Sequence, residues 1–372
     1  SFMVLVSLLG DFDSSILPVF YEYKRQITTH VLVHGKHERD IKIADRITRG
    51  LNAVRSKYRL KCTLKEIATD AENMKSIMTL VGEISKLAPP DQLYINVSDG
   101  LAGLVITVAK EMLDINANLF IYDRYRNSIS VLTQEGIKIE AIAHNMNIDD
   151  HIISKGYTLL EAKSRKELDY RKPYVDEITN NFPLFQKYRK RIMQGRKIDE
   201  ERYDEIIKPL YKMGMTTHNG RILNTNYVLG ELFEEQIYHI VNELAFDDIQ
   251  SGVKVRYETI DGITVQNEFD LLMIKDNHLY IVECKFRDRV DGENLIYKYD
   301  ALLDQMDHDG KVMIINVAST ESKEALKRGR RIHKNFEKGA LSRAQLNNIL
   351  IYYEPTLDVS KLTAMMRRFF EL

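Results

Sequence analysis

The stretch "NEFDLLMIKDNHLYIVECKF", residues 267–286, has the pattern of two strands joined by a tight turn. Asp276 and Asn277 separate two apolar runs, and Asx residues tolerate the positive φ angles that a two-residue hairpin turn requires. A turn at these two residues places Lys275 opposite His278. The stretch therefore predicts an antiparallel hairpin with a defined register.

This register gathers charged side chains on one face of the hairpin. Asp270 is paired with Glu283, and Glu268 is paired with Lys285. Because side chains alternate between the two faces of a strand, all four lie on a single face. The opposite face carries side chains suited to a core, namely Phe269, Leu271, Val282 and Cys284.

The pairing of Asp270 with Glu283 requires an explanation. Directly opposed side chains have Cβ atoms about 5 Å apart, and like charges so placed destabilise a hairpin. Glu268 and Lys285 can form a cross-strand ion pair, whereas the hairpin offers the two paired acids no cation. A divalent ion would neutralise them, and carboxylate oxygens suit Mg²⁺ or Mn²⁺. A solvent-facing strand with mixed charges is the alternative, but acids within apolar strands favour a functional site.

Such a centre has the parts needed to hydrolyse a phosphodiester. A bound divalent ion lowers the pKa of an attacking water. Lys285 can orient that water or offset negative charge on the phosphorus. A predicted helix at 225–244 precedes the hairpin, and its acid pair Glu234 and Glu235 can reach the same centre.

Residues 1–145 alternate short apolar strands with amphipathic helices. This alternation is typical of βαβ units around a buried parallel sheet, and right-handed crossovers make it a Rossmann-like domain. Strands are predicted at 3–9, 29–35, 93–98 and 118–124, helices at 38–57, 70–87 and 101–115, and a closing hairpin at 128–142.

Residues 146–215 break this pattern. The segment is charge-dense and tyrosine-rich, and we interpret it as a helical connector punctuated by Pro173, Pro183 and Pro209. Its basic cluster could hold nucleic acid, but acids follow at once, which favours a solvated helix face. The cluster comprises Lys187, Arg189, Lys190, Arg191, Arg196 and Lys197.

Residues 216–372 predict a second α/β domain. The order of helix, hairpin and αβ crossover gives a mixed sheet with helices on both sides. After the helix at 225–244, strands are predicted at 252–258, 265–274, 278–286, 311–318 and 348–354, with helices at 293–307, at 321–335 and at the end of the chain.

Composition sets the class of protein. A chain of 372 residues with 29% charged residues fits a globular protein of two domains. No apolar run is long enough to span a membrane, and the short run at 3–9 is interpreted as a strand and not a signal peptide. Cys62 and Cys284 are expected to be buried free thiols, which predicts a cytoplasmic protein. A net charge of −1 gives no global attraction to nucleic acid or membrane.

The hairpin resembles the core of the PD-(D/E)xK nucleases. "NEFDLL" and "LYIVECKF" place Asp270, Glu283 and Lys285 at the three signature positions. "GELFEEQIY" resembles the preceding helix of that fold, whose acid would be Glu234, and "NLIYKYDALLDQM" matches the helix that follows. In this family the backbone carbonyl at the position of Cys284 commonly completes the metal shell. Leu232-Phe233 stand where a tryptophan-leucine pair is expected, and we interpret this as a packing substitution.

The whole arrangement resembles the CRISPR-associated nucleases that join a CARF sensor domain to a PD-(D/E)xK domain. The resemblance implies a homodimer that a cyclic oligoadenylate activates, with the tetra-adenylate as the expected ring, and that acts on DNA or RNA in type III CRISPR defence. It assigns residues 1–145 to the sensor, 146–215 to the connector and 216–372 to the nuclease. On this resemblance Asp270, Glu283, Cys284 and Glu234 hold the metal, Lys285 positions the nucleophile and Glu268 orients Lys285.

"YINVSDGLAGLVITVAKEM", residues 94–112, runs from a strand through a small-residue loop into a helix. Ligands bind open α/β sheets at such strand ends, and free N–H groups at a helix start favour phosphate, although tight packing also wants small residues. CARF domains use this loop together with the loop after the first strand, but the family loop is usually richer in Gly and Thr. The expected ligand residues are Leu9, Gly10, Asp11, Phe12, Asn96, Ser98, Asp99, Gly100, Ala102 and Gly103.

A second basic stretch, "KEALKRGRRIHKNFEKG" at 323–339, could hold a phosphate backbone, or it could be an ordinary surface helix. Its candidate contacts are Arg328, Arg330, Arg331 and Lys334. A ligand-sensing regulator with a silent nuclease fold is the competing hypothesis, and the complete acid-and-lysine set argues against it. A nucleotide-dependent metabolic enzyme is disfavoured because no G-x-G-x-x-G is present.

Overall fold

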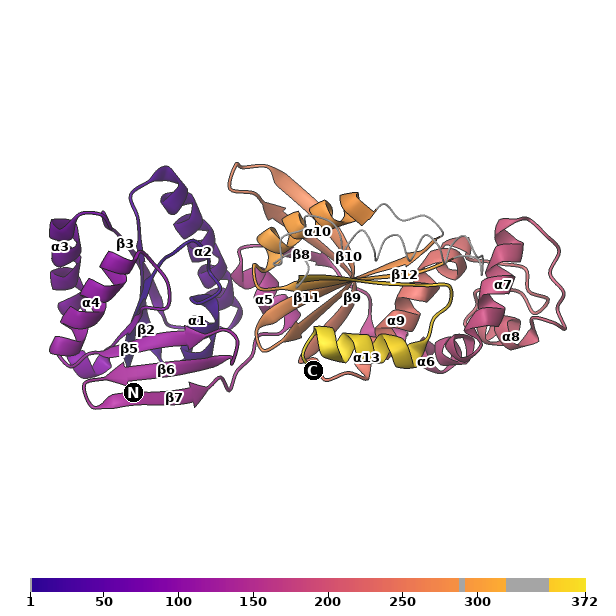
Figure 1. Cartoon of the computed structure of the whole chain (residues 1–372), viewed down its shortest axis with the longest axis horizontal. Helices are drawn as coiled ribbons and strands as arrows, with labels where there is room; N and C mark the ends of the chain where they lie inside the picture. Colours follow the sequence, from indigo (N-terminus) through magenta and orange to yellow (C-terminus); the bar gives the residue numbers. More distant parts are fainter. Residues whose placement is uncertain (1, 288–291, 319–347) are drawn as a thin grey trace. The chain divides into compact units, whose positions relative to one another are not determined.

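The computed structural model of the chain describes residues 2–287, 292–318 and 348–372 (Figure 1). These residues form two compact units. The first contains Ser1–Leu159 and Val255–Gln266, and the second contains Leu160–Lys254 and Asn267–Leu372. Both units are layered α/β structures, so the predicted fold class is confirmed. Within the described residues no helix is both long and apolar enough to cross a membrane.

The sheet of the first unit has the strand order β3-β2-β1-β4-β5-β6-β7. Neighbours from β3 to β5 run parallel, and the last two strands run antiparallel. The strands are β1 (Met3–Leu8), β2 (Ile27–His34), β3 (Thr63–Ala68), β4 (Leu93–Asn96), β5 (Asn118–Asp123), β6 (Ser128–Thr133) and β7 (Gly136–Ala141). The predicted Rossmann-like sheet and its closing hairpin are both present.

Helices connect these strands and cover the sheet. They are α1 (Leu17–Tyr23), α2 (Glu38–Lys57), α3 (Met74–Ser85) and α4 (Ala102–Asp114). Apolar side chains of β1, β2 and β4 pack with α3 and α4 in one continuous core cluster. Strand β3 was not predicted, because it is an edge strand whose sequence TLKEIA is largely exposed and carries charges.

The second sheet is mixed and has the order β13-β12-β11-β10-β9-β8. β11, β12 and β13 are parallel, whereas β10 and β11 form an antiparallel pair. The strands are β8 (Thr158–Glu161), β9 (Asp248–Glu258), β10 (Thr264–Lys275), β11 (His278–Phe286), β12 (Lys311–Val317) and β13 (Ile349–Glu354). The four-residue strand β8 was not predicted, because it lies in the charge-dense segment.

The β10–β11 hairpin has the register that the sequence predicted. Lys275 pairs with His278, and the paired ladder continues to Leu271 and Val282. Asp276 and Asn277 have φ angles of 50° and 66°, as a tight hairpin turn requires. The turn residues therefore set the register of the strands that carry the candidate acids.

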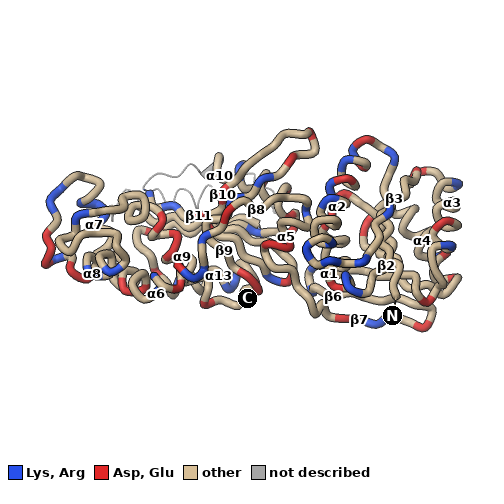
Figure 2. Tube along the Cα trace, turned by 180° about the vertical axis from the view of Figure 1, so that it is seen from behind, with Lys and Arg blue, Asp and Glu red and all other residues tan. Residues whose placement is uncertain are grey.

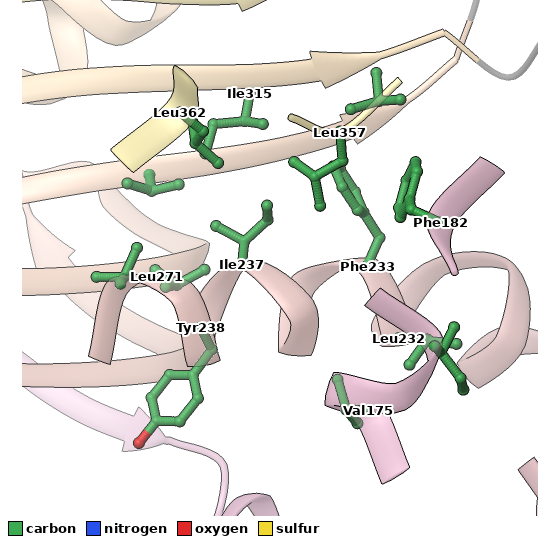
Figure 3. Close-up of a cluster of buried hydrophobic side chains, with 14 of the residues drawn as sticks. Val175, Phe182, Leu232, Phe233, Ile237, Tyr238, Leu271, Ile315, Leu357 and Leu362 are labelled. Carbon is green, nitrogen blue, oxygen red and sulfur yellow. The ribbon is translucent and has the colours of Figure 1, made fainter. Parts of the chain in front are cut away.

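Helices cover both faces of this sheet (Figure 1). α9 (Leu232–Asn242) and α13 (Val359–Phe369) pack on the face that carries Leu271 and Ile315, in the cluster drawn in Figure 3. α10 (Gly292–Met306) contributes buried residues that lie outside this cluster and contacts β12 and β13. Phe233 belongs to this cluster, so it packs into the core at the position where the tryptophan-leucine pair was expected.

The segment interpreted as a connector is largely built into the second unit. It forms α5 (Ile148–Ser154), α6 (Arg165–Asn180), α7 (Phe182–Met193) and α8 (Asp204–Lys212). Phe182 and Phe185 of α7 are buried in the same cluster as Phe233. Pro173 and Pro209 lie inside α6 and α8, so the expectation that they punctuate the helices was wrong. The division between the two compact units falls at Leu159–Leu160, and Val255–Gln266 joins the first unit.

Candidate active site

Asp270 and Glu283 lie just beyond the end of the paired ladder between β10 and β11. The last pair of the ladder joins Leu271 to Val282. Two residues further along β11, the backbone N–H of Cys284 donates to Asp270 Oδ2 at 2.8 Å. The carboxylate of Asp270 therefore takes a backbone donor of the neighbouring strand, and this contact holds it beside Glu283.

Glu283 is a buried acid with only 6% of its surface exposed. Burial in the first place, and then the charge of Asp270, raise the pKa of Glu283 to about 8, although Lys285 and Lys298 act in the opposite direction. Tyr299 of α10 is fully buried nearby, and its own pKa is raised by burial and by the charge of Glu283. Glu283 therefore lacks enough positive charge around it to be ionised easily at neutral pH.

Glu234 reaches the same centre from α9. The residues before this helix, Tyr227–Glu231, form one π-helical turn, a deviation frequently found at functional sites. Burial first, and then the charge of Asp270, raise the pKa of Glu234 to about 7, whereas Lys163 lowers it. Asp270 thus raises the pKa of acids on two different elements, so the three carboxylates lie within electrostatic reach of one another.

The neighbouring Glu235 points elsewhere. Its side chain is fully buried and accepts hydrogen bonds from Arg171 of α6, through Nε at 3.1 Å and Nη2 at 2.8 Å. The hydroxyl of Tyr227 donates to the same carboxylate at 2.9 Å. Glu235 is therefore a structural anchor that fixes α9, and of the acid pair only Glu234 belongs to the candidate site (Figure 2 shows the acidic residues of α9 and β10).

The two remaining predicted residues behave differently. Lys285 is half-buried on β11, pairs in register with Asn316 of β12, and lowers the pKa of Glu283. Glu268 is exposed, and its charge acts on Lys254 of β9. Among the described residues no ion pair joins Glu268 to Lys285, so the predicted cross-strand pair is not formed.

Sequence reasoning missed Lys163. It follows β8, and its Nζ lies 3.6 Å from Glu231 Oε2 and 3.6 Å from Glu234 Oε2. These distances make ion pairs but exceed a hydrogen bond, and the Nζ atom is buried with no hydrogen-bond partner among the described residues. Nothing near Lys163 in the sequence signals this role, because Glu231 and Glu234 come some seventy residues later in the chain.

The residues fit a divalent cation. Glu283 and Glu234 have pKa values raised by burial and by Asp270, and a bound dication would remove the repulsion that raises them. Cys284 supplies no thiolate, because burial and the surrounding acids raise its thiol pKa well above the usual value. Only its backbone carbonyl remains as the ligand that the resemblance implied.

Among the described residues, one group of three side chains has ligand atoms that all lie within 4.8 Å of one another, and it lies at the other end of β11 from the candidate acids. His278, Asp307 and Asp309 form this group. The carboxylate of Asp307 accepts the backbone N–H of Leu279 at 2.8 Å and that of Asp309 at 3.0 Å. These contacts connect the end of α10 to the hairpin turn, and the group is separate from the candidate centre.

The predicted ligand loops of the first unit meet at one edge of its sheet. β1 pairs directly with β4, so the loops after these strands are neighbours, and an added Cβ on Gly10 would lie 2.2 Å from Asp99 Cγ. Asn96 is buried and donates to the carbonyl of Ser15 at 2.9 Å. The hydroxyl of Ser98 accepts the backbone N–H of Tyr122 at 2.7 Å. Asn96 and Ser98 therefore serve to shape the loops.

The sequence from just before the π-helical turn onward is similar to a known domain type. Residues 222–348 match the Card1-like endonuclease domain. The match covers β9 to β12, the acids of the centre and Lys285. Lys163 and Arg171 lie outside the matched residues and come from the segment before this domain.

Solved structures share the architecture of the whole chain. Protein VC1899 from Vibrio cholerae is 15% identical, with a TM-score of 0.72 over 99% of this chain and 98% of that chain. Can2 from Sulfobacillus thermosulfidooxidans, solved in complex with cyclic tetra-adenylate, is 14% identical, with a TM-score of 0.67 over 98% of both chains. A type III CRISPR defence DNA nuclease activated by cyclic oligoadenylate is 13% identical, with a TM-score of 0.52 over 93% of this chain and 53% of that one. No curated protein sequence matches the chain significantly.

These likenesses confirm the predicted two-domain α/β architecture, a Rossmann-like unit followed by a second α/β domain. The predicted phosphate contacts Arg328, Arg330, Arg331 and Lys334 fall inside the matched domain but outside the described residues. In the basic cluster at 187–197, Arg189 is buried over the ring of Phe286 and donates to the carbonyl of Leu229. Arg189 is therefore structural, while Lys187, Lys190, Arg196 and Lys197 are exposed (Figure 2).

Proposed function

We propose that this protein is a divalent-metal-dependent nuclease that a cyclic oligoadenylate activates and that acts on DNA or RNA in type III CRISPR defence in the cytoplasm. The observation that carries the proposal is the convergence of Asp270, Glu283 and Glu234 as acids, two of them with raised pKa values, in a domain of endonuclease type. The cyclic tetra-adenylate bound to Can2 and the activity of the type III CRISPR DNA nuclease support the choice of activator and reaction.

Asp270 and Glu283 would hold Mg²⁺ or Mn²⁺ together with the backbone carbonyl of Cys284. Glu234 would be a further ligand or would act through a bound water. The dication would supply Lewis acidity and a lowered pKa for the attacking water. Loading it requires Glu283 to lose its proton, because only the carboxylate form is a ligand.

Lys285 is the cation that this chain itself contributes to the reaction. It lies two residues beyond Glu283 on the same strand, so its side chain projects from the same face of β11. There it would hold the nucleophilic water and offset the charge that develops on the phosphorus. Glu268, which makes no ion pair with Lys285, would contribute only negative charge at the rim of the site.

The activator would bind at the edge formed by the loops after β1 and β4, across the two-fold axis of a homodimer. Residues 1–145 would then be the sensor, 146–215 the segment that passes on ligand binding, and 216–372 the nuclease. Leu101 and Ile106 at the start of α4 are 55% and 68% exposed beside this edge, which supports self-association there. Cyclic tetra-adenylate is the activator that we propose, on the precedent of Can2.

The test is a cleavage panel with single-stranded DNA, RNA and supercoiled duplex, each with and without Mn²⁺ and with cyclic tetra- or hexa-adenylate. We expect cleavage that requires both metal and the tetra-adenylate and that is lost in Glu283→Ala. Full activity of Glu283→Ala would reject this centre. Binding of nucleic acid without cleavage in any arm would favour the regulator with a silent nuclease fold.

A further inference from the structure

Lys163 lies among the acids of the nuclease centre although it comes from outside the endonuclease domain. Its Nζ atom is 3.6 Å from one carboxylate oxygen of Glu231 and 3.6 Å from one of Glu234. Glu231 ends the π-helical turn and Glu234 lies one turn further along α9, so both acids face the same ammonium group. The acids of the centre thus fall into two sets. Among the described residues, Lys163 pairs with Glu231 and Glu234, whereas Asp270 and Glu283 form no ion pair.

The backbone around Lys163 holds this cation in place. Its N–H donates to the carbonyl of Ser251 on β9 at 2.9 Å. Its aliphatic stem lies against Gly252, where an added Cβ would be 2.8 Å from Lys163 Cγ and 3.0 Å from its Cε. Gly252 has a φ of 59°, so glycine meets the need for both a left-handed conformation and room for the lysine. The ammonium group is therefore directed into the centre by its surroundings and is not a mobile surface charge.

We propose that Lys163 takes the place of a second divalent cation, so that the centre binds a single metal ion, at Asp270 and Glu283. This inference rests on the proposed nuclease function. A dication beside Glu231 and Glu234 would stand next to the buried Nζ atom of Lys163, and repulsion between the two positive charges would oppose its binding. Lys163 instead neutralises Glu231 and Glu234, and the acids of β10 and β11, Asp270 and Glu283, remain to bind the metal.

Lys163 acts in this account through Glu234, as a positioning residue. It keeps the carboxylate of Glu234 on the α9 side of the centre, where it can hold a water of the metal shell, and it limits the number of ions that bind. An arginine would keep the charge but not the compact point geometry of an ammonium group. A methionine would keep the apolar stem against Gly252 and remove only the charge.

The experiment counts Mn²⁺ ions bound per chain by titration calorimetry and by electron paramagnetic resonance on the full-length protein. Wild type is expected to bind one ion, and Glu283→Gln is expected to lose it. Lys163→Met is expected to bind a second ion, or to bind the first about tenfold more tightly, because a repelling charge is gone. Either gain should vanish in the double variant Lys163→Met with Glu234→Gln. Lys166→Met, at an exposed lysine nearby, is the matched control and should behave as wild type.

A second variant protects the test against a simple folding defect. Gly252→Asn tolerates the left-handed backbone, but its Cβ displaces the lysine stem, so it should reproduce the metal binding of Lys163→Met. The inference would be overturned if wild type binds two ions and loses both in Glu283→Gln, or if metal binding is unchanged in Lys163→Met.

The outcomes also separate this inference from the proposed function. If wild type binds no Mn²⁺ and cleaves nothing, the proposed function fails. If wild type binds one ion and cleaves, and Lys163→Met does the same, only this inference fails.

Discussion

Acids gather in two regions of this chain, on the middle strands β10 and β11 of the second sheet and in the loops after β1 and β4 of the first, and their surroundings differ. In the nuclease centre, Glu283 is 6% exposed, and burial and Asp270 raise its pKa to about 8. At the edge of the first sheet, Asp99 is half-buried and accepts the backbone N–H of its neighbour Gly100 at 2.8 Å. The nuclease centre therefore contains buried carboxylates whose charge a dication would neutralise. At the edge of the first sheet, by contrast, the carboxylate of Asp99 already accepts a hydrogen bond from its neighbour.

The difference teaches that an acid cluster identifies a site only when burial leaves it without sufficient partners. The adjacent residues Glu234 and Glu235 show the same difference. Glu235 is the more buried of the two, but its carboxylate accepts hydrogen bonds from Arg171 and Tyr227, and its role is structural. Glu234 has one ion pair, with Lys163 at 3.6 Å, and a charged neighbour in Asp270, and it belongs to the candidate site.

The largest effect should follow from a change in the centre. Asp270→Asn keeps the shape of the side chain but removes the charge, and we expect cleavage to fall by about a thousandfold. Glu268→Gln, on the same strand and the same face, should change the rate by about twofold or less, because its exposed charge is screened by water. Single-turnover cleavage with saturating Mn²⁺ measures both. Equal losses in the two variants would show that the face as a whole, not the buried pair, carries the activity.

The next effect concerns the anchor beside the centre. Arg171→Met leaves Glu235 buried without its cation and should lower the free energy of unfolding by about 3 kcal/mol. Arg165→Met, which breaks the more exposed pair with Asp248, should cost about 1 kcal/mol or less. Urea denaturation of both variants gives the comparison. A loss in Arg165→Met as large as that in Arg171→Met would mean that burial of the pair is not what matters.

A smaller effect is expected at the edge of the first sheet. Gly10→Ala forces the carboxylate of Asp99 to move, since the new Cβ would lie 2.2 Å from its Cγ. We expect the affinity for cyclic tetra-adenylate to change by about tenfold, with the metal affinity of the nuclease centre unchanged. Gly82→Ala on α3, where an added Cβ meets nothing, is the control. Unaltered activator binding in Gly10→Ala would place the ligand elsewhere.

The sequence allowed prediction wherever local chemistry determines structure. The Asp276-Asn277 turn sets the hairpin register, and this register alone was enough to predict that Asp270 and Glu283 lie together. The residue pattern alone left Glu234 and Glu235 as an acid pair, and only the family resemblance selected Glu234. The physical reason lies in Arg171 of α6, which binds Glu235 and is remote in the sequence. The role of Lys163 could not be predicted for the same reason, because it depends on the path of the chain at β8 and on Gly252 of β9. Pro173 was misjudged because core packing overrides its usual effect on helices.

The central claim is that Glu283 is a protonated acid until a dication replaces its proton, and proton release on metal binding tests it most directly. Because the pKa of Glu283 is about 8 and that of Glu234 about 7, Mn²⁺ binding near neutral pH should release about one proton or more, with release declining as the pH rises above the pKa of Glu283. Titration calorimetry in buffers of different ionisation enthalpy counts these protons. The account predicts that Glu283→Gln abolishes the release. Mn²⁺ binding without any proton release at neutral pH, or release that persists in Glu283→Gln, would contradict it.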